Sequence, residues 1–223
     1  MLARPGAFGA VPSGPGQNRH RGVGDAAQRL RPQTRLAHRL DAADHREQER
    51  RQMVRVRGRI DVLVANAGVV ADAVLGDHTE ENVDLTLAVN VKGPLLTVQK
   101  ALPLLAEDAS VVVVGSSNSA RPNAELEIYS ASKAALSNLV HNWARRSGER
   151  RFRVNVLSPG PTRTPALLRV AGEDADRFAE AVVPLGRLAD PEEIAEAALF
   201  LASRASSFVT GAELFADGGY TRA

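Results

Sequence analysis

Three short, largely apolar runs constrain the fold of this 223-residue chain most strongly: residues 62–64, 111–114 and 154–157. A run without polar alternation is typical of a strand that is covered on both faces, as in a parallel sheet flanked by helices. Each run is followed within a few residues by a turn-forming stretch that contains glycine. The three runs are therefore predicted to be buried strands.

The length and the composition narrow the class further. A chain of 223 residues is expected to form one domain with a full hydrophobic core. It contains no cysteine, which excludes disulfides, thiolate metal sites and thiol catalysis. No stretch approaches eighteen consecutive apolar residues, and no secretory signal is recognisable, so neither a membrane helix nor export is expected. A cytoplasmic location fits best.

Four polar residues suggest acid–base chemistry. Tyr129 and Lys133 stand four residues apart in the run Tyr-Ser-Ala-Ser-Lys, which on a helix places them on one face, about 6 Å apart along the axis. A fixed ammonium at that distance favours the phenolate and is expected to lower the tyrosine pKa. Ser116 precedes Tyr129 by thirteen residues, directly after the second apolar run, and Asn90 lies in a predicted helical stretch. The simpler alternative is a solvated Tyr–Lys pair.

These residues belong to an ordered series of motifs, which are residues 58–68, 89–93, 111–117, 129–133, 153–160 and 207–220. In this order and spacing the series resembles the short-chain dehydrogenase/reductase family from about Gly58 to the C-terminus. The resemblance implies an α/β protein with a Rossmann-type, doubly wound parallel sheet sandwiched by helices. It also implies an NAD(P)-dependent oxidoreductase that transfers a hydride between a nicotinamide cofactor and a small-molecule carbonyl or secondary alcohol.

The resemblance assigns roles to the four polar residues. Tyr129 would be the general acid in reduction and the base in oxidation, and the Ser116 hydroxyl would donate to the substrate carbonyl. Ser117 is the alternative to Ser116. Lys133 would lower the pKa of Tyr129 and bind the nicotinamide ribose, and Asn90 would bend its helix and hold a water that extends a proton relay. No metal is implied.

The resemblance also assigns cofactor contacts to residues that follow two of the strands. The expected set, to which Tyr129 and Lys133 are added, is Asn66, Ala67, Gly68, Pro159, Gly160, Thr162 and Thr164. The alternative for the first three is an ordinary turn, and for the last four a proline-rich strand exit. Residues 166–181 are expected to form a helix pair that covers a partly apolar substrate. The substrate and the choice between NAD and NADP stay open.

Residues 1–57 do not match the family and are interpreted as an atypical, degenerate cofactor-binding segment ahead of the catalytic portion, 58–223. The closest match to the family's glycine-rich phosphate turn is 22–30, which has only a Gly-x-Gly and no preceding apolar strand. At least one βα unit is therefore incomplete or irregular, and strand 61–65 is expected to lie at an apolar sheet edge. A reading-frame or start error in a GC-rich gene is one hypothesis for this segment.

The charge distribution and the family pattern bear on possible partners and on an alternative function. Residues 1–59 carry thirteen arginines and five acids. This excess can indicate nucleic-acid binding, but no aromatic residues or binding motif accompany it, so no nucleic-acid partner is expected. The family pattern implies a homo-oligomer, a dimer or a homotetramer, through helices at 84–105 and 130–146. A different class of function is a catalytically degenerate family member that lacks cofactor binding and acts as a scaffold.

Overall fold

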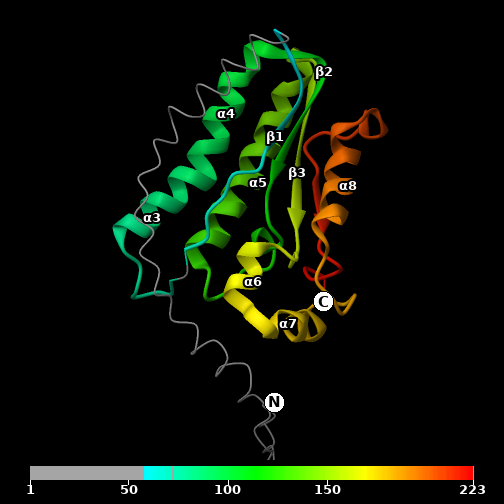
Figure 1. Ribbon diagram of the computed structural model, residues 1–223. Helices are drawn as coiled ribbons and strands as arrows, with labels where there is room; N and C mark the ends of the chain where they lie inside the picture. The colour runs from blue at the N-terminus through cyan, green and yellow to red at the C-terminus, as the bar shows by residue number, and fades with distance from the viewer. Residues whose placement is uncertain (1–57, 72, 223) are drawn as a thin grey trace, which may run out of the picture. The chain divides into compact units, whose positions relative to one another are not determined.

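The computed structural model describes residues 58–71 and 73–222 of the chain (Figure 1). They contain a four-stranded sheet in the order β1-β2-β3-β4, with every neighbouring pair parallel. The strands are β1 (Ile60–Ala65), β2 (Leu105–Val114), β3 (Phe152–Pro159) and β4 (Glu213–Ala216). The prediction of a parallel sheet is confirmed. Because the strands share one direction, their carboxyl ends lie at the same edge of the sheet.

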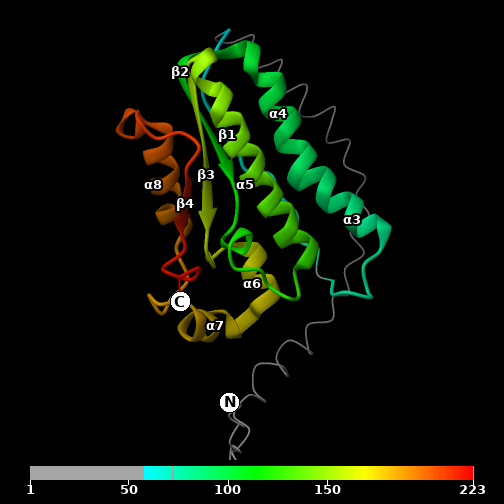
Figure 2. The same ribbon diagram turned by 180° about the vertical axis from the view of Figure 1, so that it is seen from behind.

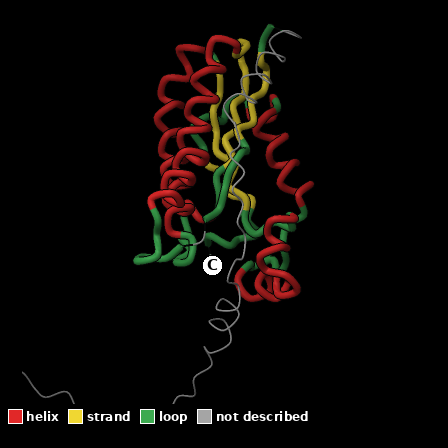
Figure 3. Tube along the Cα trace, turned by 60° about the vertical axis from the view of Figure 1, so that its left-hand side comes forward, coloured by secondary structure: helices red, strands yellow, loops and turns green. Residues whose placement is uncertain are grey.

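Helices cover both faces of this sheet (Figures 1 and 3). The first layer comprises α3 (Glu80–Leu87), α4 (Gly93–Ala101) and α5 (Glu127–Ser147), and α8 (Pro191–Ala202) lies on the opposite face. Val111 and Val113 pack with the α5 residue Leu136, whereas Val112 packs with Leu201 of α8. Successive side chains of β2 are therefore buried on opposite faces, which explains why this run is apolar at every position.

The helical stretch predicted for residues 84–105 is divided into several pieces. A π-helical turn, η1 (Ala88–Lys92), separates α3 from α4, and a 3-10 turn, η2 (Leu102–Leu104), follows α4. Leu105 already begins β2, so the predicted helix ran too far. Pro103 lacks the N–H that would continue the α-helical hydrogen bonds. The second predicted helix, 130–146, lies within α5 as expected.

The segment after β3 forms the expected helix pair, α6 (Pro165–Ala171) and α7 (Ala175–Val182), before the chain enters α8 (Figure 2). A capping box starts α8, in which Glu193 accepts a hydrogen bond of 2.9 Å from the Asp190 amide. Asp190 is the N-cap of this helix. Among the helices of the described residues, none is long and apolar enough to cross a membrane.

Strand β1 lies at one end of the strand order within the described residues. Its side chains Val62 and Val64 are 45% and 48% exposed there, although the run of residues 62–64 is typical of a strand covered on both faces. This agrees with the expected apolar edge. The glycine run at 22–30 and the rest of residues 1–57, on which that expectation partly depends, lie outside the described residues.

Candidate active site

Helix α5 presents Tyr129 and Lys133 at the carboxyl edge of the sheet. The Lys133 Nζ lies 5.7 Å from the centroid of the Tyr129 ring. The lysine is only 3% exposed, and its ammonium donates a hydrogen bond of 2.9 Å to the carbonyl of Val114, the last residue of β2. The end of a buried strand therefore fixes the position of the charge beside the phenol.

Ser116 follows β2 and faces the same phenol. It precedes the 3-10 turn η3 (Ser117–Ser119), and its Oγ accepts a hydrogen bond of 3.2 Å from the Asn118 amide. Its hydroxyl also makes a hydrogen bond with the Tyr129 side chain, which acts to lower the tyrosine pKa. The neighbouring Ser117 is 3% exposed, and its carbonyl accepts from two amides of the following turn. Of the two candidate serines, Ser116 is therefore the one that meets Tyr129.

Burial has the largest effect on the pKa values of Tyr129 and Lys133. It raises the pKa of Tyr129 above 10, and the hydrogen bond from Ser116 opposes that rise only in part. Burial also lowers the pKa of Lys133 to about 8. The sequence predicted a lowered tyrosine pKa, and the direction is the reverse because desolvation penalises the phenolate more than its polar neighbours stabilise it.

Asn90 connects helix α5 to the segment that follows β1. Its Oδ1 accepts from the Val69 amide at 2.8 Å, and its Nδ2 donates to the Val69 carbonyl at 2.9 Å and to the Ser132 Oγ at 3.1 Å. Asn90 is fully buried in the π-helical turn η1, where the i→i+4 ladder is interrupted. The helix is thus irregular at Asn90, and the side chain is bonded to two other segments rather than facing solvent.

The turn of Asn66, Ala67 and Gly68 leaves the carboxyl end of β1 and is exposed in the described structure. A Cβ atom at Gly68 would lie 3.4 Å from the Lys133 Nζ and 3.5 Å from the Asn90 Oδ1. Gly68 therefore lies directly against two of the predicted catalytic residues. The exposed backbone of this turn and the buried ammonium form one polar surface at the edge of the sheet.

The loop after β3 contains the second group of predicted cofactor residues. Pro159 ends β3, and Gly160 packs so closely on Asp217 that a Cβ atom would lie 2.6 Å from its Cα. Thr162 donates from Oγ1 to the Gly160 carbonyl at 2.9 Å, and Thr164 Oγ1 accepts from the Leu167 amide at the start of α6. Both threonines therefore shape the loop, and each hydroxyl oxygen keeps capacity for a further hydrogen bond.

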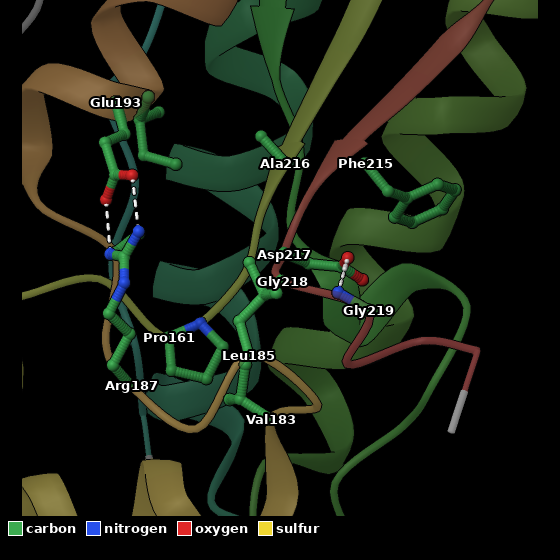
Figure 4. A pocket seen from close by; sticks show the side chains of 12 residues that line it. Pro161, Val183, Leu185, Arg187, Glu193, Phe215, Ala216, Asp217, Gly218 and Gly219 are labelled. Atoms are coloured by element: carbon green, nitrogen blue, oxygen red, sulfur yellow. Dashed lines mark hydrogen bonds and ion pairs between the residues drawn. The ribbon is translucent and has the colours of Figure 1, made fainter.

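A hollow of about 280 Å³ adjoins the same loop at Pro161 (Figure 4). Its lining includes Leu185, Phe215 and the ion pair between Arg187 and Glu193, whose two contacts measure 2.7 and 2.8 Å. The guanidinium lowers the pKa of Glu193 to about 2. The lining contains no atom of the tyrosine or the lysine on α5. This hollow is therefore distinct from the place where the reacting groups meet.

The sequence analysis did not single out several polar residues that support these groups. Ser132 bonds to Asn90 and donates to the Tyr129 carbonyl at 2.7 Å. Glu213, at the start of β4, accepts hydrogen bonds from Ser119 and Ser158. A charged residue directly before the apolar residues of the last strand was the available signal for Glu213. Its partners become visible only when β4 pairs with β3.

Comparison with known proteins identifies the family. A family model described as enoyl-(acyl carrier protein) reductase matches residues 16–221. The chain is 39% identical over 170 residues to the 3-oxoacyl-[acyl-carrier-protein] reductase FabG of Thermotoga maritima. The matched region covers 75% of this chain and 69% of that protein. The chain belongs to the short-chain dehydrogenase/reductase family.

Solved structures agree with this assignment. A short-chain dehydrogenase/reductase from Serratia marcescens is 34% identical, with a TM-score of 0.73 over 78% of this chain and 71% of that one. The angucycline C-6 ketoreductase LanV, solved with bound NADP, is 32% identical, with a TM-score of 0.72 over 78% of this chain and 68% of that one. The chain spans about two thirds of the length of the curated relatives it matches.

Proposed function

We propose that this protein is an NAD(P)-dependent oxidoreductase that interconverts a carbonyl group and a secondary alcohol. One observation carries the proposal: the phenol of Tyr129 meets the hydroxyl of Ser116 and the buried ammonium of Lys133 at the carboxyl edge of the sheet. Relatives that are named as a 3-oxoacyl-[acyl-carrier-protein] reductase and a ketoreductase support this class of reaction.

In carbonyl reduction Tyr129 would give its proton to the substrate oxygen, and in alcohol oxidation it would remove that proton. The raised pKa favours the protonated phenol, which suits the acid role. The Ser116 Oγ accepts from the Asn118 amide, and the proton that it gives to the Tyr129 oxygen would turn to the developing negative charge on the substrate oxygen. Two hydroxyl groups would therefore converge on one oxygen.

Lys133 and Asn90 would support this proton transfer. The ammonium would stabilise the phenolate that forms when Tyr129 gives up its proton, and it has two N–H groups beyond the one bonded to Val114. Those two donors suit the hydroxyl groups of a ribose. Asn90 holds the segment at Val69 against α5, and we propose that it also helps a water continue the proton path from Lys133.

The polar groups at the sheet edge fit the nicotinamide end of a dinucleotide. The residues that would hold it are those of the β1 turn and the β3 loop together with the α5 pair, namely Asn66, Ala67, Gly68, Pro159, Gly160, Thr162, Thr164, Tyr129 and Lys133. When bound, the cofactor supplies or accepts the hydride. Residues 1–57, to which the family pattern assigns the phosphate contacts, lie outside the described part of the chain. The proposal therefore covers NAD and NADP alike.

We also propose the organisation of the whole protein from the family pattern. Residues 58–223 would form the catalytic portion, and residues 1–57 would be an atypical, arginine-rich segment that corresponds to a degenerate cofactor-binding half. The protein would act as a homo-oligomer, a dimer or a tetramer, in the cytoplasm, on a small-molecule substrate. Exposed apolar side chains at Leu199, Phe200 and Phe208 support an interface between copies.

The test is a titration of NADH and NADPH into the purified protein, followed by a panel of ketones and 3-oxoacyl thioesters. We expect one nucleotide to bind saturably and at least one carbonyl to be reduced. Tyr129→Phe should lower kcat by at least 100-fold because it removes the hydroxyl group that carries the transferable proton. Nucleotide affinity should change far less than kcat. A folded protein that binds neither nucleotide would instead support the degenerate scaffold.

A further inference from the structure

We infer that Glu213 is a positioning residue that holds Ser116 and the β3 loop in their working geometry. This inference rests on the proposed function, because it concerns the same site. Glu213 does not touch Tyr129 or Lys133 in any described contact, and it belongs to the last strand of the sheet. Its carboxylate nevertheless connects the two loops from which the predicted catalytic serine and the predicted cofactor contacts come.

The contacts of Glu213 are short and specific. Its Oε1 accepts a hydrogen bond of 2.7 Å from the Ser119 Oγ and one of 2.6 Å from the Ser158 Oγ. Ser119 is the last residue of the turn η3, and Ser158 is a fully buried residue of β3 directly before Pro159. Hydroxyl groups bound to a carboxylate form stronger hydrogen bonds than neutral pairs do. One oxygen atom thus connects the turn η3 to the end of β3, directly before the loop that contains the predicted cofactor contacts.

Ser119 transmits this constraint to Ser116. The Ser119 amide and its Oγ approach the Ser116 carbonyl at 2.9 and 2.7 Å. Ser119 has a single hydroxyl proton, which is shared between that carbonyl and Glu213. The carboxylate therefore sets the rotamer of Ser119, and Ser119 fixes the backbone of Ser116. Without the carboxylate, the hydroxyl of Ser119 could turn away and release one contact of the turn.

Packing around Gly115 makes the arrangement rigid. A Cβ atom at Gly115 would lie 2.5 Å from the Ser158 Oγ, so the residue before Ser116 lies directly on the second partner of Glu213. Glu213 is in register with Val156 of β3, so the strand pairing fixes the backbone that carries the carboxylate. A displacement of about 1 Å at a reacting group can cost about 100-fold in rate. The cluster is therefore placed to control the Ser116 hydroxyl.

The experiment compares Glu213→Ala, Glu213→Gln and Ser119→Ala in the full chain, with Glu196→Ala on the exposed surface of α8 as the matched control. We expect Glu213→Ala to lower kcat for carbonyl reduction at least tenfold, with KM and the melting temperature nearly unchanged. Glu213→Gln should restore most of kcat, since the amide oxygen still accepts from both serines. Because the two residues act through a shared hydrogen bond, the double variant Glu213→Ala/Ser119→Ala should lose less activity than the product of the two single losses.

Amide hydrogen exchange of Ser119 supplies a readout that does not depend on activity. In Glu213→Ala this amide should exchange at least tenfold faster, and in Glu196→Ala it should not change. An unchanged exchange rate in Glu213→Ala would overturn the inference about Glu213, whether or not the wild-type protein reduces a carbonyl. A wild-type protein that reduced no carbonyl would refute only the proposed function. Equal losses in the alanine and glutamine variants, with a lower melting temperature, would also overturn it.

Discussion

The buried ammonium of Lys133 should make the folded protein less stable at neutral pH than a variant without it. Burial lowers the pKa of Lys133 from 10.5 to about 8. At about 1.4 kcal/mol for each pH unit, this gap corresponds to about 3 kcal/mol of unfavourable free energy. Lys133→Met removes that cost, and it also removes the hydrogen bond to the Val114 carbonyl, worth about 1 kcal/mol. The net expectation is a gain of about 2 kcal/mol at pH 7.

The gain should depend on pH in a defined direction. The folded state binds the lysine proton more weakly than the unfolded chain does, so the penalty is complete below pH 8 and disappears as the pH rises toward 10.5. The free energy of unfolding of the wild-type protein should therefore increase by about 2 kcal/mol, relative to Lys133→Met, between pH 7 and pH 9.5. The variant itself should lack carbonyl reductase activity at both pH values.

Urea unfolding without nucleotide provides the assay, because the single tryptophan of the chain, Trp143, is half-buried against the core and reports unfolding through its fluorescence. Lys92→Met, at an exposed position of the π-helical turn η1, is the matched control and should show no such gain. The reasoning would be refuted if Lys133→Met were no more stable than the wild type at pH 7. A stability difference that was equal at pH 7 and pH 9.5 would refute it as well.

Two further substitutions test the packing that positions the site. Gly115→Ala places a Cβ atom 2.5 Å from the Ser158 Oγ. We expect the free energy of unfolding in urea to fall by about 1–3 kcal/mol and kcat to be lower. Wild-type values for both would contradict the close packing. Arg153→Met removes guanidinium hydrogen bonds to the carbonyls of Leu201 and Ser203 and to the Ser206 Oγ. It should cost about 2–4 kcal/mol, whereas Arg150→Met at an exposed position should cost less than about 0.5 kcal/mol.

Much of the fold was predictable because local patterns and tertiary packing agree. The apolar runs at 62–64, 111–114 and 154–157 form parallel strands, and the helix expected at 130–146 lies within α5. The helix expected to reach residue 105 was too long, because a π-helical turn and Pro103 interrupt it. Apolar periodicity continues through such irregularities, so a pattern of hydrophobic residues does not reveal them.

Some features of the candidate site were likewise predictable from the sequence, and others depended on the tertiary structure. The sequence by itself determined the four-residue spacing of Tyr129 and Lys133 and the position of Ser116 at the end of a strand, because these follow from the periods of a helix and a strand. Only the tertiary structure decided that burial raises the tyrosine pKa and that Ser116, rather than Ser117, meets the phenol. It alone placed Glu213 against both loops. Desolvation and contacts between distant strands depend on how the layers pack, and a linear pattern does not contain that information.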